Sequence, residues 1–158
     1  MDLITWIGQT GVHRWLAETP FWFPYPFVIA VHSMGMGIIV GLNVAVDLRI
    51  LGAAPGIPLA PLERFFPVMW LGFGLNAITG AGLMTAHPEL LANWVMWIKL
   101  TCIALSLVSL RLLRAQVFRD PNLDKGLLSL RSQLLAGASI FFWAGAITAG
   151  RMTAYLGS

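Results

Sequence analysis

A histidine inside a long apolar stretch is the residue of this chain that most needs a chemical explanation. His32 lies in the segment 31–52, which reads VHSMGMGIIVGLNVAVDLRILG. Hydrocarbon offers an imidazole no hydrogen-bonding partner, so a histidine in such a setting is expected to bind a ligand or pair with another polar group. Its role therefore depends on the polar residues that other apolar segments bring to the same depth.

Four apolar segments must position those residues. The chain has 158 residues, of which 58% are hydrophobic and 11% charged, whereas a soluble domain carries roughly 25% charged residues. This composition predicts an all-α integral membrane protein whose single domain, 1–158, is covered by the lipid bilayer. Spans are expected at about 27–51, 65–86, 94–113 and 133–156, and each approaches or exceeds the ~20 residues needed to cross a bilayer. Their short connections predict an up-down bundle of four transmembrane helices.

The segment before the first span predicts a helix that lies on the membrane surface. Residues 2–18 are too short and too polar to span, and their apolar residues fall near a helical spacing of three and four. This pattern favours an N-terminal amphipathic interfacial helix with Trp6 and Trp15 at headgroup depth. A secretory signal is not expected, because the segment lacks a positively charged start.

The distribution of Lys and Arg predicts the orientation of the bundle. The first and third loops and the adjoining span ends hold Arg49, Arg64, Arg111, Arg114, Arg119, Lys125 and Arg131, whereas the opposite side holds Arg14, Lys99 and Arg151. The positive-inside rule then places both termini on the periplasmic side of a bacterial inner membrane. No basic run suggests nucleic acid, and the single cysteine, Cys102, excludes an intrachain disulfide.

Each predicted span brings one basic or imidazole group to the outer third of the bundle. These groups are His32, His87, Lys99 and Arg151, and the nearest acidic residue is Glu89, in a turn. A group of cations without a counter-charge is unfavourable in a low dielectric. The pattern therefore predicts a bound anion or a ligand that carries carboxylates.

Heme b meets these requirements. Its iron takes an axial imidazole, predicted here as His32 with His87 as the candidate second ligand, and its propionates would pair with Lys99 and Arg151. Gly35 and other glycines would let a flat macrocycle approach the helix backbones, although glycines at this spacing also serve direct helix–helix contact. For His32 the alternative is a structural hydrogen bond to a carbonyl, Asn76 or Thr79.

A copper site is a second interpretation of the same helix. Imidazole and thioether groups bind Cu(I), and Met36 shares a helical face with His32. Methionines in apolar helices more often serve packing.

The charged residues in the inner half of the first span are expected to set the membrane topology rather than to form a chemical site. Asp47 and Arg49 lie near its end, where a local salt bridge or pairing with Arg64, Arg111 or Arg114 is expected. The chain has no nucleophile–base pair, paired catalytic carboxylates or phosphate loop, so nothing in the sequence by itself argues for an enzyme.

A family resemblance runs through these residues. His32 with the glycine-rich helix, the run Asp47-Leu48-Arg49-Ile50-Leu51-Gly52, and Trp97-Ile98-Lys99 resemble an uncharacterised family of small four-helix bacterial membrane proteins. The chain is more distantly similar to the copper-resistance D membrane domain and to the heme-containing membrane protoporphyrinogen oxidase. In the oxidase a histidine and a lysine at the places of His32 and Lys99 are functional. Its pattern has a further Arg and His where this chain has Asp47-Leu48-Arg49, so that Arg49 matches but no histidine follows.

The sequence therefore predicts a b-type heme protein that takes part in electron transfer as a subunit of a larger redox complex. Its expected partners are other membrane or periplasmic redox subunits, with a homo-oligomer as a further arrangement. Two alternatives stay open: a cofactor-free accessory or scaffold subunit of a membrane complex, and a copper-handling membrane protein.

Overall fold

The described part of the chain is all-helical. The computed structural model describes residues 9–11, 14–15, 24–119, 123 and 128–156. Its principal elements are the helices α3 (Pro24–Ile50), α4 (Phe65–Ala86), α5 (Trp94–Val117) and α6 (Leu130–Leu156), with the short 3₁₀ helices η2 (Ala60–Arg64) and η3 (Pro88–Ala92). The predicted interfacial helix at 2–18 lies almost wholly outside the described residues.

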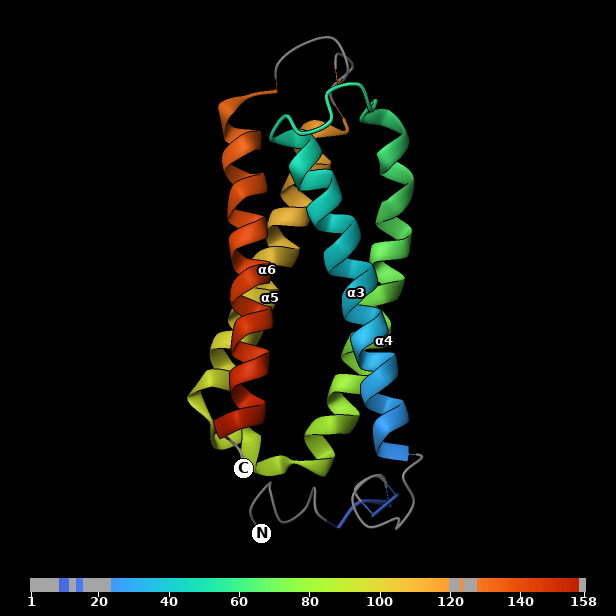
Figure 1. Cartoon of the computed structure of the whole chain (residues 1–158), viewed down its shortest axis with the longest axis vertical. Helices are drawn as coiled ribbons and strands as arrows, with labels where there is room; N and C mark the ends of the chain where they lie inside the picture. The colour runs from blue at the N-terminus through green and yellow to red at the C-terminus, as the bar shows by residue number, and fades with distance from the viewer. Residues whose placement is uncertain (1–8, 12–13, 16–23, 120–122, 124–127, 157–158) are drawn as a thin grey trace.

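All four long helices could cross a membrane by length and composition. Together with η2, α4 forms a continuous apolar candidate span over Ala60–Ala86. The start of α3 and the ends of α4 and α6 lie at one end of the molecule, which we call the termini end (Figure 1). The connection between α3 and η2 and the start of α6 lie at the other end, which we call the loop end.

The helices associate as two pairs that follow the order of the chain. Helix α3 packs along α4, and α5 packs along α6, while a smaller α3–α6 contact joins the pairs. Figure 1 shows the pairs approaching each other toward the loop end. The first and last long helices of the described chain therefore close the bundle.

Local chemistry explains where α3 ends. The amide of Gly52 donates to the carbonyl of Arg49 (3.1 Å) and that of Ala53 donates to Leu48 (2.9 Å), which is the Schellman pattern that satisfies the last helical carbonyls. Gly52 adopts a φ of 99°, which favours glycine. The Arg49 side chain then donates to the carbonyls of Pro55 (3.2 Å) and Ile57 (2.5 Å), so the loop folds back over the helix end.

The tight connection at the termini end also follows from residue types. Pro88 begins η3 and prevents α4 from continuing through His87. Asn93 then caps α5, because its side-chain oxygen accepts from the amide of Val95 at 2.9 Å. His87 is thereby held at a helix boundary.

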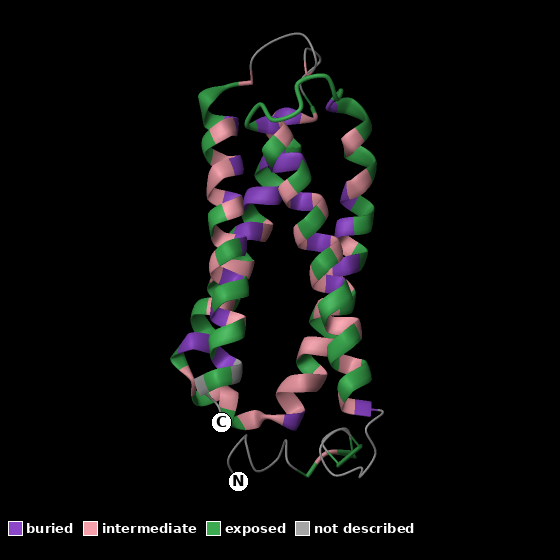
Figure 2. Ribbon diagram, viewed as in Figure 1, coloured by how far each residue is buried: buried purple, intermediate pink, exposed green. Residues whose placement is uncertain are grey.

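The most tightly buried residues gather toward the loop end. Figure 2 shows buried positions concentrated where the two pairs approach, with mainly intermediate and exposed positions toward the termini end. The buried cluster comprises Ile39, Val46, Ile50, Leu59, Phe66, Met69, Leu110, Leu113, Val117, Ala136, Trp143 and Ala146. The interior is therefore closed at the loop end and more open at the termini end.

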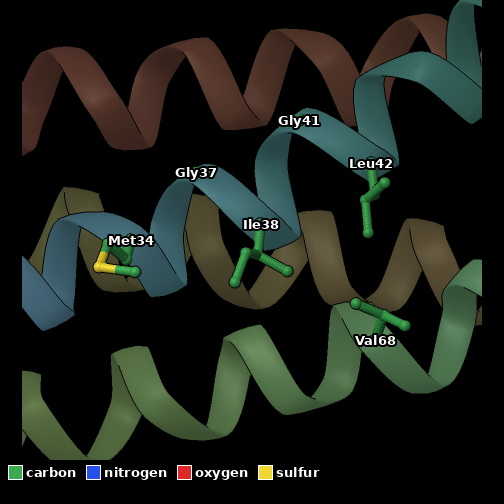
Figure 3. A pocket seen from close by; sticks show the side chains of 6 residues that line it. All are labelled: Met34, Gly37, Ile38, Gly41, Leu42 and Val68. Carbon is green, nitrogen blue, oxygen red and sulfur yellow. The ribbon is translucent and has the colours of Figure 1, made fainter.

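The opposite face of α3 carries a shallow apolar groove against α4. Six residues line it: Met34, Gly37, Ile38, Gly41, Leu42 and Val68 (Figure 3). A Cβ atom added to Gly37 or Gly41 would meet nothing within 4 Å. These two glycines leave open space on the outside of the bundle, the side from which hydrocarbon would contact it.

Candidate functional site

A close contact between α3 and α4 fixes the position of His32. A Cβ atom on Gly35 would lie 2.8 Å from the carbonyl oxygen of Gly72, so the two backbones approach as closely as glycine permits. One turn away, the side-chain amide of Asn76 donates to the carbonyl oxygen of His32 at 2.8 Å. Gly35 therefore serves direct helix–helix contact, which was the alternative to a cofactor slot. This contact places the His32 ring against α4.

The His32 ring is held by one nitrogen. Its Nδ1 lies 3.0 Å from the Thr79 hydroxyl, and its Cε1 would lie 3.1 Å from a Cβ atom on Gly80. The Thr79 hydroxyl has one proton, which it donates to the Leu75 carbonyl at 2.6 Å. We therefore assign the ring proton to Nδ1, which donates to Thr79, and the lone pair to Nε2. The structure realises the Thr79 bond that the sequence allowed, and this bond leaves the other nitrogen available to a ligand.

Lys99 brings a positive charge into the same interior region. Its side chain is half-buried and packs on α6, where a Cβ atom on Gly150 would lie 3.5 Å from the Lys99 Cε and 3.7 Å from its Nζ. It lies within electrostatic range of His32. Within the described ranges, no acidic side chain pairs with Lys99. The helices thus place an ammonium group near an imidazole without supplying its counter-charge.

His87 uses both ring nitrogens in local contacts. Its Nε2 lies 3.1 Å from the Tyr25 hydroxyl, and its Nδ1 lies 3.0 Å from Oε1 of Glu89. The rings of Tyr25 and His87 also meet edge to face, with 5.6 Å between centroids. His87 therefore ties α3 to the end of α4, and ligand binding through Nε2 would require it to leave Tyr25.

The other predicted site residues are placed less centrally. Arg151 has an exposed side chain near the end of α6, and Met36 is half-buried one turn after His32 on α3. Among the described residues, no group of three or more His, Cys, Asp and Glu side chains is arranged to hold a metal ion. A heme iron needs fewer protein ligands than that, so this observation leaves the heme prediction untested.

A second polar group lies fully buried between α3 and α6. It includes Asp47, which was expected to set topology. Asn43, Asp47 and Ser139 are each 0% exposed. The Asn43 side-chain amide donates both to Oδ2 of Asp47 and to the Ser139 hydroxyl, the latter at 2.9 Å. Asp47 forms no ion pair among the described residues, and Arg49 instead donates to the loop carbonyls. The expected salt bridge of Asp47 is therefore not formed.

Helical spacing could have identified this group. His32, Met36, Asn43 and Asp47 follow one another at intervals of four, seven and four residues, which places them on one face of a helix. That face is the one α3 presents to the interior, as the buried Ile39 and Ile50 show. Residues 32–47 of α3 therefore carry a stripe of four polar or sulfur-containing side chains on its interior face.

Comparison with known proteins adds no relative. Neither the family models, nor the curated proteins, nor the solved structures include a match to this chain. The function must therefore be argued from the site itself.

Proposed function

We propose that this chain is a multi-pass, up-down four-helix membrane bundle that binds b-type heme near its termini end and takes part in electron transfer. The proposal includes a bacterial inner-membrane location, with the termini on the periplasmic side, and assembly with a larger redox complex. One observation carries the heme assignment: His32 is fixed through Nδ1, its Nε2 has no partner among the described residues, and Lys99, within electrostatic range, has no acidic partner among them.

The Thr79–His32 hydrogen bond gives the imidazole the form that a metal ligand needs. An imidazole that binds iron through one nitrogen usually donates its other N–H to an acceptor, and this bond fixes the ring orientation and raises its basicity. Thr79 provides that acceptor and is itself held by the Leu75 carbonyl. The ring is therefore oriented before any ligand arrives.

Lys99 supports the same assignment through charge. A carboxylate that enters this region would neutralise an ammonium group for which the described residues provide no partner. Heme carries two such carboxylates on an apolar ring, and when bound it would supply a one-electron iron couple. Lys99 would hold one propionate, whereas Arg151, which is exposed, would reach a propionate only at the edge of the bundle.

An absorption spectrum of the purified protein, oxidised and then reduced with dithionite, tests the proposal. We expect a Soret band and a reduced α-band, and their absence from protein expressed with sufficient heme would overturn it. His32→Ala should abolish both bands, while the matched variant His13→Ala should retain them. Persistence of the bands in His32→Ala would show that His32 is not the ligand.

The second axial position can be tested separately. Tyr25→Phe removes the hydroxyl partner of His87 Nε2 without altering His32. If His87 is the second ligand, this change should tighten heme binding and His87→Ala should convert low-spin iron to high-spin. Unchanged electron paramagnetic resonance spectra in both variants would exclude His87.

The same preparations separate the alternatives. Copper handling predicts bound copper that is lost when His32 and Met36 are replaced together. A scaffold role predicts neither chromophore nor metal, together with co-purification of a larger membrane complex.

A further inference from the structure

The buried group formed by Asn43, Asp47 and Ser139 carries a second inference, one that does not depend on heme. Three buried polar atoms on α3 and α6 have no hydrogen-bonding partner among the described residues: Oδ1 of Asn43, Oδ1 of Asp47 and Nε1 of Trp143. Trp143 is 2% exposed and lies one turn after Ser139 on α6. Since buried polar groups are normally satisfied, these atoms indicate a small ligand at the α3–α6 contact.

The charge of Asp47 indicates what that ligand must do. An ionised carboxylate at a fully buried position is costly unless a cation compensates it. Asn43, which donates to Asp47, and Ser139, to which Asn43 also donates, are both neutral. The site must therefore take up a positive charge to become neutral.

No charged side chain of the packed helices provides that compensation. Helix α4 contains no charged residue, and α6 has only Arg131 and Arg151, both exposed. On α5, Lys99 lies toward the termini end, while Arg111 stacks on Trp70 and Arg114 pairs with Glu63. On α3 itself, Arg49 donates to the loop carbonyls.

The available atoms fit a proton better than a metal cation. Hard metal cations take six or more oxygen ligands, whereas this site offers the two unpartnered oxygens and the Ser139 hydroxyl. The Trp143 indole N–H is a donor and offers a cation no ligand. A protonated carboxyl removes the charge without further ligands and converts one unpartnered acceptor into a donor.

We propose that Asp47 is an exchangeable proton-binding site at the α3–α6 contact, neutral in the assembled bundle. Uptake of one proton from the aqueous phase forms the O–H bond on Oδ1 and removes the carboxylate charge. Release returns the proton to the aqueous phase and restores the charge. Release would therefore weaken the contact that joins the two helix pairs.

Infrared spectroscopy of the full chain, labelled with aspartate carrying ¹³C at the side-chain carboxyl, tests this proposal. Ordinary aspartates, with a pKa of about 4, are ionised at about pH 7. We expect an isotope-shifted carboxylic-acid band at about pH 7 that is lost in Asp47→Asn and retained in the exposed control Glu63→Gln. Absence of that band from the wild-type protein would overturn the proposal, even if the variant fails to fold.

Two further measurements locate the proton and distinguish it from a metal ion. Ser139→Ala should shift the frequency of the band, because Ser139 accepts from the same Asn43 amide that donates to the carboxyl; an unmoved band would contradict the assigned position. Loss of the band on exchange of potassium for sodium, together with a higher melting temperature, would identify a sodium site instead and overturn the proposal.

Discussion

Helix α3 makes two contacts of different kinds, one in each half. Toward the termini end, α3 meets α4 through backbone, at Gly35 and Gly72, and through the Asn76 bond to the His32 carbonyl. Toward the loop end, α3 meets α6 through side chains, with Asn43 bonded to Ser139. One half uses small residues to bring helices together, and the other uses polar residues to join them.

The difference in burial separates the two polar groups functionally. His32 and Lys99 face the interior yet remain half-buried, whereas Asn43 and Asp47 are completely buried. A bulky ligand requires room and an accessible ring nitrogen, and half-buried His32 suits it better than the fully buried Asp47 does. A proton requires no such room, and the second group suits it.

The largest expected effect is a difference in stability between variants of Asn43 and Asn76, one asparagine from each half of the bundle. Asn43→Ala removes the donor to both Asp47 and Ser139 inside the closed half and should lower the free energy of unfolding by about 3 kcal/mol. Asn76→Ala removes one bond in the more open half and should cost about 1 kcal/mol. Unfolding by sodium dodecyl sulfate in mild detergent measures both, and equal losses would show that the two halves are equally closed.

A pair of glycines tests the backbone contact. Gly35→Ala places a methyl group 2.8 Å from a backbone oxygen of α4, and the required displacement should cost about 2 kcal/mol. Gly37→Ala enters open space on the same helix and should leave stability unchanged or raise it, because alanine favours helix. Similar melting temperatures for the two variants would contradict the close contact.

Two threonines test the orientation of the His32 ring. Thr79→Val keeps the side-chain shape but removes the oxygen that accepts from Nδ1, so heme affinity should fall about 10-fold. Thr101→Val is the matched control, because that hydroxyl only donates to the Trp97 carbonyl on an exposed face. Heme titration followed by absorbance measures the difference, and identical affinities would remove Thr79 from the site.

The smallest effect is expected at the protein surface. Glu63 and Arg114 form an exposed ion pair at 3.3 Å, so Glu63→Gln should change the free energy of unfolding by less than about 1 kcal/mol. The change should shrink further in salt. A larger loss would indicate that the loop end depends on surface charge as well as on its buried contacts.

Hydropathy was sufficient to predict an all-helical chain with four helices able to cross a membrane. Those helices depend on local composition, which a sequence displays directly. Sequence alone did not reveal which helices pair closely, because that depends on where two backbones can touch. Gly35 illustrates the limit: its spacing was compatible with a cofactor slot and with helix contact, and only the position of Gly72 assigns it to the contact.

The two polar groups differ in how far the sequence revealed them. An isolated histidine in an apolar run draws attention, and Thr79 was among its expected partners. The salt bridge predicted between Asp47 and Arg49 is not formed, because residues two apart on a helix project in different directions. The partner of Asn43, Ser139 on the last helix, is separated from it by 96 residues, a distance at which a single sequence gives no sign of contact.

That separation has a consequence for how the protein is made. Helices α3 and α4 can pair soon after both have left the ribosome, since their contact needs nothing further along the chain. The bond between Asn43 and Ser139 cannot form until α6 has been synthesised. Until then, the Asn43 amide has only Asp47, on its own helix, as a side-chain partner. Completion of the last helix therefore supplies the Ser139 contact that helps to join the two helix pairs.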